Sequence, residues 1–221
     1  HLVALKQRRD LEIVAVVDDL VTFGFFDAQI YIWHHDGQAL EGWNPKQLGA
    51  VRPSIPVLAD LIPDAEGKLE ILVAYERESS IISEADYFVQ VWDVSGLLPA
   101  GWPQIIQRLG LRSSGVNIVM LPPAVGDLDG DGGKEVFYVG PTYYDFSNIH
   151  ENNLAAWHYD GSFVAGWPTA TLFASEFFSH APAFAVGDVD GNGSIEIIVV
   201  VRQWVEGPLP DRYSMIIYRS D

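Results

Sequence analysis

The sequence of 221 residues contains no cysteine and little positive charge, with 13 Lys and Arg against 30 Asp and Glu. The lack of cysteine excludes a disulfide framework, thiolate catalysis and cysteine-bound zinc. The formal net charge of −17 disfavours binding to nucleic acids or anionic membrane surfaces and favours binding of cations. The chain also lacks an apolar run of the ~20 residues that a membrane-spanning helix needs. We therefore expect no nucleic-acid partner and no insertion into a membrane.

An apolar stripe with helical spacing is also missing, and the chain instead repeats three landmarks. An acidic residue opens a β-branched run, an aromatic residue follows 21 or 22 positions later, and a Gly-Trp pair begins nine positions after the aromatic in three units. The acids are Glu12, Glu70, Glu135 and Glu196, the aromatics are Trp33, Trp92, Trp157 and Tyr218, and the pairs begin at Gly42, Gly101 and Gly166. The chain is therefore a repeat protein with about 60 residues in each unit.

Each unit is predicted to contain four short strands, and the third unit illustrates the pattern. Its expected strands are residues 123–126, 135–140, 154–159 and 163–167, with a hairpin turn at Asp160-Gly161. Four-stranded units repeated at this period predict an all-β fold, a β-propeller built of four-stranded antiparallel blades. The Gly-Trp pairs are then expected to pack between blades.

The predicted propeller is partial, with two full blades and two incomplete ones. Residues 1–221 form a single propeller segment whose repeats are 1–52, 53–119, 120–180 and 181–221. We expect the first repeat to lack its opening strand and the last to end after its third strand. The chain begins at His1 rather than Met. Because a closed propeller usually needs more blades than these, we expect the chain to be part of a longer protein, or a fragment that a partner completes.

The most specific candidate site is a loop rich in carboxylates, which lies between the first and second strands of the third and fourth units. Oxygen-bearing side chains occupy positions 1, 3, 5 and 9 of each loop, and glycine occupies position 6. Alternating carboxylates in a tight loop converge on one point, and an all-oxygen ligand set suits Ca²⁺ rather than zinc or copper. A backbone carbonyl at position 7 can add a further ligand. The predicted metal ligands are Asp127, Asp129, Asp131, Gly133 and Glu135, and Asp188, Asp190, Asn192, Ser194 and Glu196.

The loops are not EF-hands, because position 12 holds Tyr138 or Val199 instead of a bidentate Glu and the flanks are strands. The second unit carries a degenerate version of the loop, which would be a third calcium site. Its candidate ligands are Asp60, Asp64, Glu66 and Glu70. The first unit retains only Glu12, so we expect no ion there.

These loops, with the tryptophan, Asp-Gly and Gly-Trp-Pro landmarks, resemble the FG-GAP/VCBS repeats of integrin α-subunit-like β-propellers, and in particular their bacterial secreted members. The resemblance covers nearly the whole chain. It implies a propeller of seven or eight blades with largely structural Ca²⁺ in the loops that join the first two strands of a blade. It also implies an extracellular or cell-surface location and a role in adhesion or recognition of a protein or glycan, usually without catalysis.

Strand order predicts which end of the blades binds a ligand. In an up-and-down blade, the calcium loops and the Asp-Gly turns share one end, and the long connections from second to third strands lie at the other. Aromatic residues gather in these long connections and in the segments between blades, where they suit sugar stacking or a protein contact. An alternative is that they fold down as local core. The candidates are Phe25, Phe26, Tyr143, Tyr144, Phe146, Phe178 and Trp204.

No catalytic motif is present, so we expect a non-enzymatic protein. The sequence contains no Gly-x-Ser-x-Gly elbow and no His-rich metal motif. His34 and His158 recur just after the third-strand tryptophan, which indicates a structural role. Two alternatives remain. One is part of a propeller-fold polysaccharide lyase, which would need a cationic groove for its acidic substrate. The other is a spacer module of a secreted enzyme.

Overall fold

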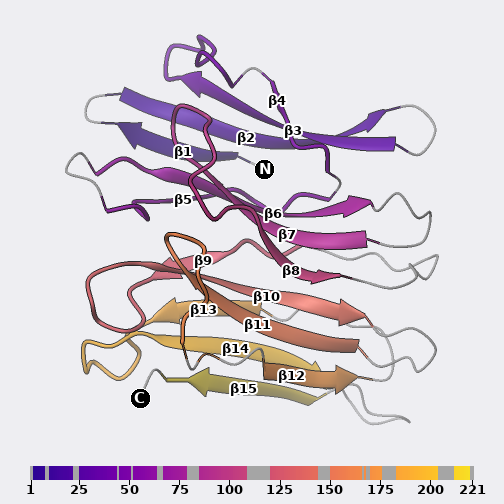
Figure 1. Ribbon diagram of the computed structural model, residues 1–221, viewed down its shortest axis with the longest axis vertical. Helices are drawn as coiled ribbons and strands as arrows, with labels where there is room; N and C mark the ends of the chain where they lie inside the picture. The colour runs from indigo at the N-terminus through magenta and orange to yellow at the C-terminus, as the bar shows by residue number, and fades with distance from the viewer. Residues whose placement is uncertain are drawn as a thin grey trace.

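The computed structural model describes residues 2–7, 10–21, 25–43, 45–50, 52–63, 67–78, 85–108, 120–143, 150–165, 167, 170–175, 183–203 and 212–219. In this part of the chain the regular secondary structure consists of β-strands alone, and the strands form four antiparallel sheets. Sheets that are consecutive in sequence pack against one another, and the third and fourth overlap in the view of Figure 1. The described residues include no helix long and apolar enough to cross a membrane. The fold class is therefore the predicted one, a partial β-propeller.

Consecutive strands are neighbours in every sheet. The first sheet contains β1 (Leu2–Gln7), β2 (Asp10–Val21), β3 (Phe25–His34) and β4 (Lys46–Gln47). The second contains β5 (Val57–Ala59), β6 (Glu70–Glu78), β7 (Ala85–Trp92) and β8 (Gln104–Arg108). The third contains β9 (Ala124–Gly126), β10 (Glu135–Tyr143), β11 (His150–His158) and β12 (Ala170–Ser175). The fourth contains β13 (Ala183–Gly187), β14 (Glu196–Gln203) and β15 (Arg212–Tyr218).

Two details of the strand prediction were wrong. The first unit does have an opening strand, because β1 pairs with β2 from Leu2↔Ala15 to Gln7↔Asp10. The sequence pattern concealed this strand because it has no carboxylate loop after it. The fourth strand of the third unit is β12 and not residues 163–167, of which Phe163 forms only an isolated bridge to Trp157. The fourth strand therefore begins after the Gly-Trp pair rather than ending at it.

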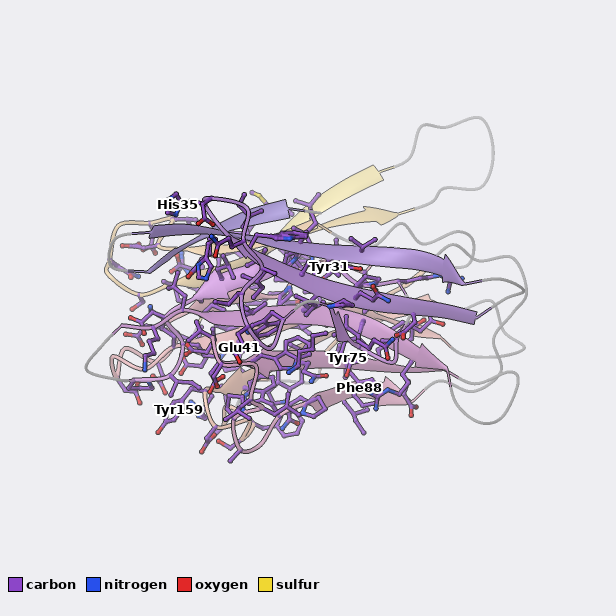
Figure 2. The ribbon with its side chains drawn as sticks, turned by 90° about the horizontal axis from the view of Figure 1, so that it is seen from above. Tyr31, His35, Glu41, Tyr75, Phe88 and Tyr159 are labelled. Atoms are coloured by element: carbon purple, nitrogen blue, oxygen red, sulfur yellow. The ribbon has the colours of Figure 1, made fainter. Side chains whose placement is uncertain are left out.

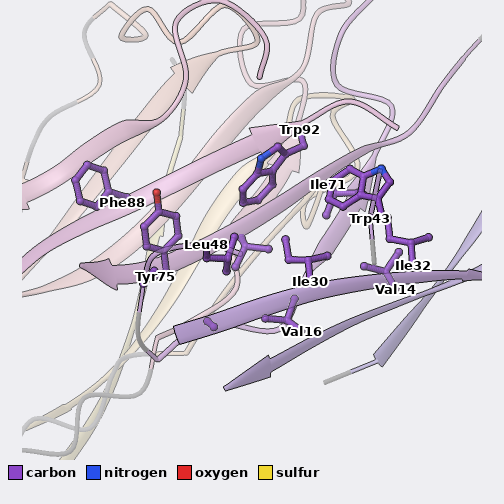
Figure 3. Close-up of a cluster of buried hydrophobic side chains, with 13 residues drawn as sticks. Val14, Val16, Ile30, Ile32, Trp43, Leu48, Ile71, Tyr75, Phe88 and Trp92 are labelled. Atoms are coloured by element: carbon purple, nitrogen blue, oxygen red, sulfur yellow. The ribbon is translucent and has the colours of Figure 1, made fainter. Parts of the chain in front are cut away.

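Alternation along the strands gives each inner sheet two apolar faces. In the second sheet, Ile71, Val73 and Tyr75 pack toward the first sheet, in the cluster shown in Figure 3. Leu72 and Ala74, on the other face, pack toward the third sheet. A third cluster joins the third sheet to Ile197 and Val199 of the fourth. The core is therefore a series of layers between neighbouring sheets, as in propeller blades.

The Gly-Trp pairs connect neighbouring units, as the repeat pattern predicts. Trp43 packs edge-on against Trp92 of the next unit, with ring centroids 6.3 Å apart, and Trp102 packs against Trp157 in the same way at 6.3 Å. Their indole N–H groups donate to backbone carbonyls in the next unit's turn, Trp43 to Val94 and Trp102 to Tyr159, each at 2.8 Å. Each tryptophan thus buries its ring and satisfies its N–H in the neighbouring blade.

Candidate metal centre

The carboxylate loops and the hairpin turns lie at the same end of the sheets. Glu135, the first residue of β10, pairs with Gly126 on one side and His158 on the other. The loop that precedes Glu135 and the turn that follows His158 are therefore neighbours. Figure 2 shows His35 and Tyr159, which lie in the turns of the first and third units, toward this same end. The predicted arrangement of the connections is confirmed.

The loop of the third unit is held by its own aspartates. Asp127 accepts hydrogen bonds from the N–H groups of Gly130 at 2.8 Å and Gly132 at 3.1 Å. Gly132 has a φ of +89°, a conformation that disfavours residues with a Cβ, so glycine is needed where the loop reverses. Carboxylate oxygens of Asp127, Asp129 and Asp131 all lie within 4.8 Å of one another. The loop therefore gathers three carboxylates around one point.

The loop of the fourth unit repeats this geometry. Asp188 accepts from the N–H groups of Gly191 at 2.7 Å and Gly193 at 2.9 Å. The side-chain oxygen of Asn192 accepts from Ser194 N–H at 2.7 Å, as Asp131 does from Gly133 N–H at 2.6 Å. Carboxylate oxygens of Asp188, Asp190 and Glu196 lie within 4.8 Å of one another. Two loops 61 residues apart in sequence thus share the hydrogen bonds made by the side chains at positions 1 and 5, with Asn192 in place of Asp131.

The glutamate at position 9 has a role that spacing alone did not reveal. Its side chain is almost fully buried, with exposed fractions of 1% at Glu135, 1% at Glu196 and 2% at Glu70. In each case Oε2 accepts the N–H of the residue at the start of the loop: Leu128 at 2.7 Å, Val189 at 2.9 Å and Leu61 at 2.8 Å. This glutamate therefore ties the loop to the second strand, and it does so even in the second unit, where the aspartate pattern is degenerate.

Histidine completes the environment of Glu135. His158 Nδ1 lies 3.2 Å from Glu135 Oε1, and a ligand atom of Asp129 lies within 4.8 Å of both side chains. Burial raises the pKa of Glu135, while the N–H of Leu128 and the ring of His158 act in the opposite direction. His34 Nδ1 lies 3.6 Å from Glu12 Oε1 in the first unit. The two histidines therefore partner the repeated glutamates, which supports their predicted structural role.

The second unit brings fewer oxygens together among its described residues. Glu70 is committed to the N–H groups of Leu61 and Ile62, at 2.8 and 3.1 Å. The carbonyl oxygen of Asp60 accepts a hydrogen bond from Lys134 of the third unit at 2.7 Å. The other two candidate ligands, Asp64 and Glu66, lie outside the described residues. A metal site in this unit stays a prediction.

The predicted ligand face lies largely outside the described part of the chain. Phe25 and Phe26 begin β3, and Tyr143 ends β10. Their backbones therefore stand at the end of the sheets opposite the carboxylate loops, as expected. Tyr144, Phe146, Phe178 and Trp204 lie outside the described residues. The aromatic face accordingly stays a prediction.

Three successive four-stranded antiparallel sheets and a fourth with three described strands, with an acidic loop between the first two strands of at least two of them, define a β-propeller-type module. Residues 127–199 match the family model of the FG-GAP-like repeat, so the chain contains an FG-GAP-like repeat. The matched segment runs from the first aspartate of the third unit's loop through the fourth unit's loop into β14. No curated protein and no solved structure matches the chain. The resemblance found in the sequence is confirmed for the repeat itself, while the integrin-like propeller and its bacterial secreted type stay predictions.

Proposed function

We propose that the loops at residues 127–135 and 188–196 each bind a calcium ion and that the chain is a calcium-stabilised binding module. The observation that carries the proposal is that each loop brings three carboxylates within 4.8 Å of one another and folds around its first aspartate through the same backbone hydrogen bonds. Clustered carboxylates repel one another, and a divalent cation with a preference for six to eight oxygens relieves that repulsion. The residues that would hold the ion are the side chains at positions 1, 3 and 5 with the backbone at position 7. Glu135 and Glu196 would contribute one carboxylate oxygen while the other keeps its backbone hydrogen bond.

Calcium removal and single substitutions test this proposal. Chelation should lower the melting temperature, because an ion that binds only the folded state stabilises it by mass action. Asp129→Ala and Asp190→Ala should each reduce the number of bound ions by one, measured by calorimetric titration and by metal analysis after dialysis. Glu41→Ala, at an exposed carboxylate in another connection, serves as the matched control. Identical melting with and without chelator would contradict the proposal.

The exposed face of the fourth sheet supports a propeller completed by further blades. Val200 is 38% exposed, Ile217 42% and Met215 66%. The residues at the same register in the second and third sheets are buried by the next sheet. In the second sheet they are Ala74, Val91 and Val89, and in the third sheet they are Val139, Ala156 and Leu154. We infer that another blade, from a longer chain or from a partner, covers this face.

Methionine oxidation tests the missing blade. The chain has two methionines, of which Met120 is 5% exposed and Met215 is 66% exposed. Hydrogen peroxide should oxidise Met215 rapidly in this chain alone. In a longer protein or complex that supplies the next blade, the oxidation of Met215 should slow to the rate of Met120. An unchanged rate for Met215 in such an assembly would contradict the inferred blade.

The proposed role is recognition of a protein or glycan outside the cell or at its surface, through the aromatic connections at the end opposite the carboxylate loops. Its support is the resemblance to adhesion propellers and the placement of Phe25, Phe26 and Tyr143 at that end. A glycan array and a pull-down with extracellular protein extracts should detect a ligand whose binding falls when Tyr143 and Tyr144 become alanine. Release of unsaturated uronate products would instead identify a lyase. Empty results in all three assays, with an intact fold, would identify a spacer.

A further inference from the structure

The residue that follows the third-strand aromatic differs among the four units in a way that affects the carboxylate loops. In the first and third sheets it lies across from the repeated glutamate, in the pairs Glu12↔His34 and Glu135↔His158. In the fourth sheet Ile197 pairs with Tyr218, so the next residue, Arg219, stands beside Glu196. The third unit thus places an imidazole next to its loop, whereas the fourth places a guanidinium.

The guanidinium of Arg219 reaches into the fourth unit's loop. Its Nη2 lies 3.2 Å from Oδ2 of Asp190, and the other oxygen of Asp190 accepts the N–H of Asn192 at 3.1 Å. Asp190 belongs to the carboxylate group with Asp188 and Glu196. The corresponding His158 contacts Glu135 instead. A permanent positive charge therefore engages one of the oxygens that a metal ion would use.

We propose that Arg219 is a built-in competitor for the cation in the fourth unit's loop, so that this loop binds calcium more weakly than the loop of the third unit. The inference rests on the proposed function, because it assumes that both loops bind calcium. An ion entering the fourth loop must either displace the guanidinium from Asp190 or bind beside it. The repulsion between a unit charge and a divalent ion roughly 6 to 12 Å apart in a water-like medium corresponds to a three- to tenfold loss of affinity, in order of magnitude.

The effect should depend on salt. The side chains of Arg219 and Asp190 are 54% and 34% exposed, so water and mobile ions reach the pair. Exposed charges are screened within about 8 Å at physiological ionic strength and over a longer distance at low salt. Because of Arg219, the two loops fill over different ranges of free calcium concentration, and the difference is larger at low ionic strength.

The experiment measures each loop alone by calorimetric titration with calcium chloride. In the Asp129→Ala background only the fourth unit's loop should bind, and there Arg219→Gln should raise the affinity about three- to tenfold at low salt and about twofold or less in 0.3 M salt. In the Asp190→Ala background the same substitution should leave the third unit's loop unchanged. The reciprocal variant His158→Arg should weaken the third unit's loop.

A matched control removes one positive charge elsewhere. Arg77, near the far end of β6 from the loops, lies over the rings of Tyr75 and Phe88, so Arg77→Gln makes the same change in net charge without touching a loop. Arg77→Gln should leave the calcium affinity of each loop within twofold of its value before the substitution. An unchanged affinity in Arg219→Gln would overturn competition by Arg219, and a lower affinity would show instead that Arg219 positions Asp190 for the ion. No calcium binding in either single-loop background, nor in the unsubstituted chain, would overturn the proposed function itself and this inference with it.

Discussion

The loop segments of the second and third units share their anchor and differ in their acidic side chains. Glu70 and Glu135 are both buried and both accept the N–H of a leucine at the start of the loop. The third unit then places Asp127, Asp129 and Asp131 around one point, whereas the second has Pro63 and two extra residues in the same stretch. The comparison indicates that the buried glutamate anchors the loop whether or not the full set of aspartates is present.

The largest expected effect comes from removing the shared anchor. Glu70→Ala and Glu135→Ala should each lower the free energy of unfolding by about 2 to 3 kcal/mol, because buried N–H groups lose their acceptor. Denaturant unfolding in the presence of a chelator measures this loss without the contribution of calcium. Glu41→Ala, at an exposed position, should change it by less than about 0.5 kcal/mol. A large loss of stability at only one of the two glutamates would contradict their shared role as anchors of the loop.

The isosteric variants should separate the anchor from the ligand. Glutamine keeps an oxygen that can accept the loop N–H but lacks the carboxylate charge. At free calcium ten times the dissociation constant, one site contributes about 1.4 kcal/mol, and Glu135→Gln should lose most of this contribution. Glu70→Gln should leave the calcium response unchanged, because the described contacts of Glu70 Oε2 are with the loop backbone, and a reduced response would instead support the predicted site in the second unit. The measurement is the difference in melting temperature with and without calcium, and an equal response in the two variants would show that Glu135 is an anchor only.

The smallest expected effect concerns the glycine at the loop reversal. Gly67 has a φ of +60° and Gly132 a φ of +89°, and nothing but Asp60 Oδ2 at 3.8 Å would meet a Cβ at either position. Substitution by alanine should therefore cost about 1 kcal/mol at each site through backbone strain alone. Asparagine, which tolerates the left-handed region near +60°, should be nearly neutral at Gly67 and costly at Gly132. Thermal unfolding in chelator checks this order, and equal tolerance of asparagine at both sites would contradict it.

Much of the fold was accessible from the sequence because each unit repeats short-range spacings. The recurring sequence spacing from Glu135 to Trp157 predicted the second and third strands of the third unit, which are β10 and β11. The pattern failed where a landmark was absent or misleading. β1 has no acidic loop to mark it, and the fourth strand of the third unit, β12, begins only at Ala170, after the Gly-Trp pair.

The candidate site could be predicted from the sequence to about the same extent as the fold. The spacing of the aspartates identified both loops, whereas the hydrogen bond between Glu135 and Leu128 and the approach of Arg219 to Asp190 were missed. One signal in the sequence would have located Arg219. It follows Tyr218, just as His158 follows Trp157, and antiparallel register places that position beside the repeated glutamate.

The order of residues along the chain already defines the number of units, their strands and the acidic loops, because a hairpin and a tight loop depend on spacings of about 20 residues or fewer. Other contacts depend on how strands and sheets pair in space. The indole N–H of Trp102 reaches Tyr159 in the next blade, and Lys134 reaches the carbonyl of Asp60 across a sheet boundary. Such contacts join residues more than fifty positions apart, so packing between blades, and not local spacing, selects the partner.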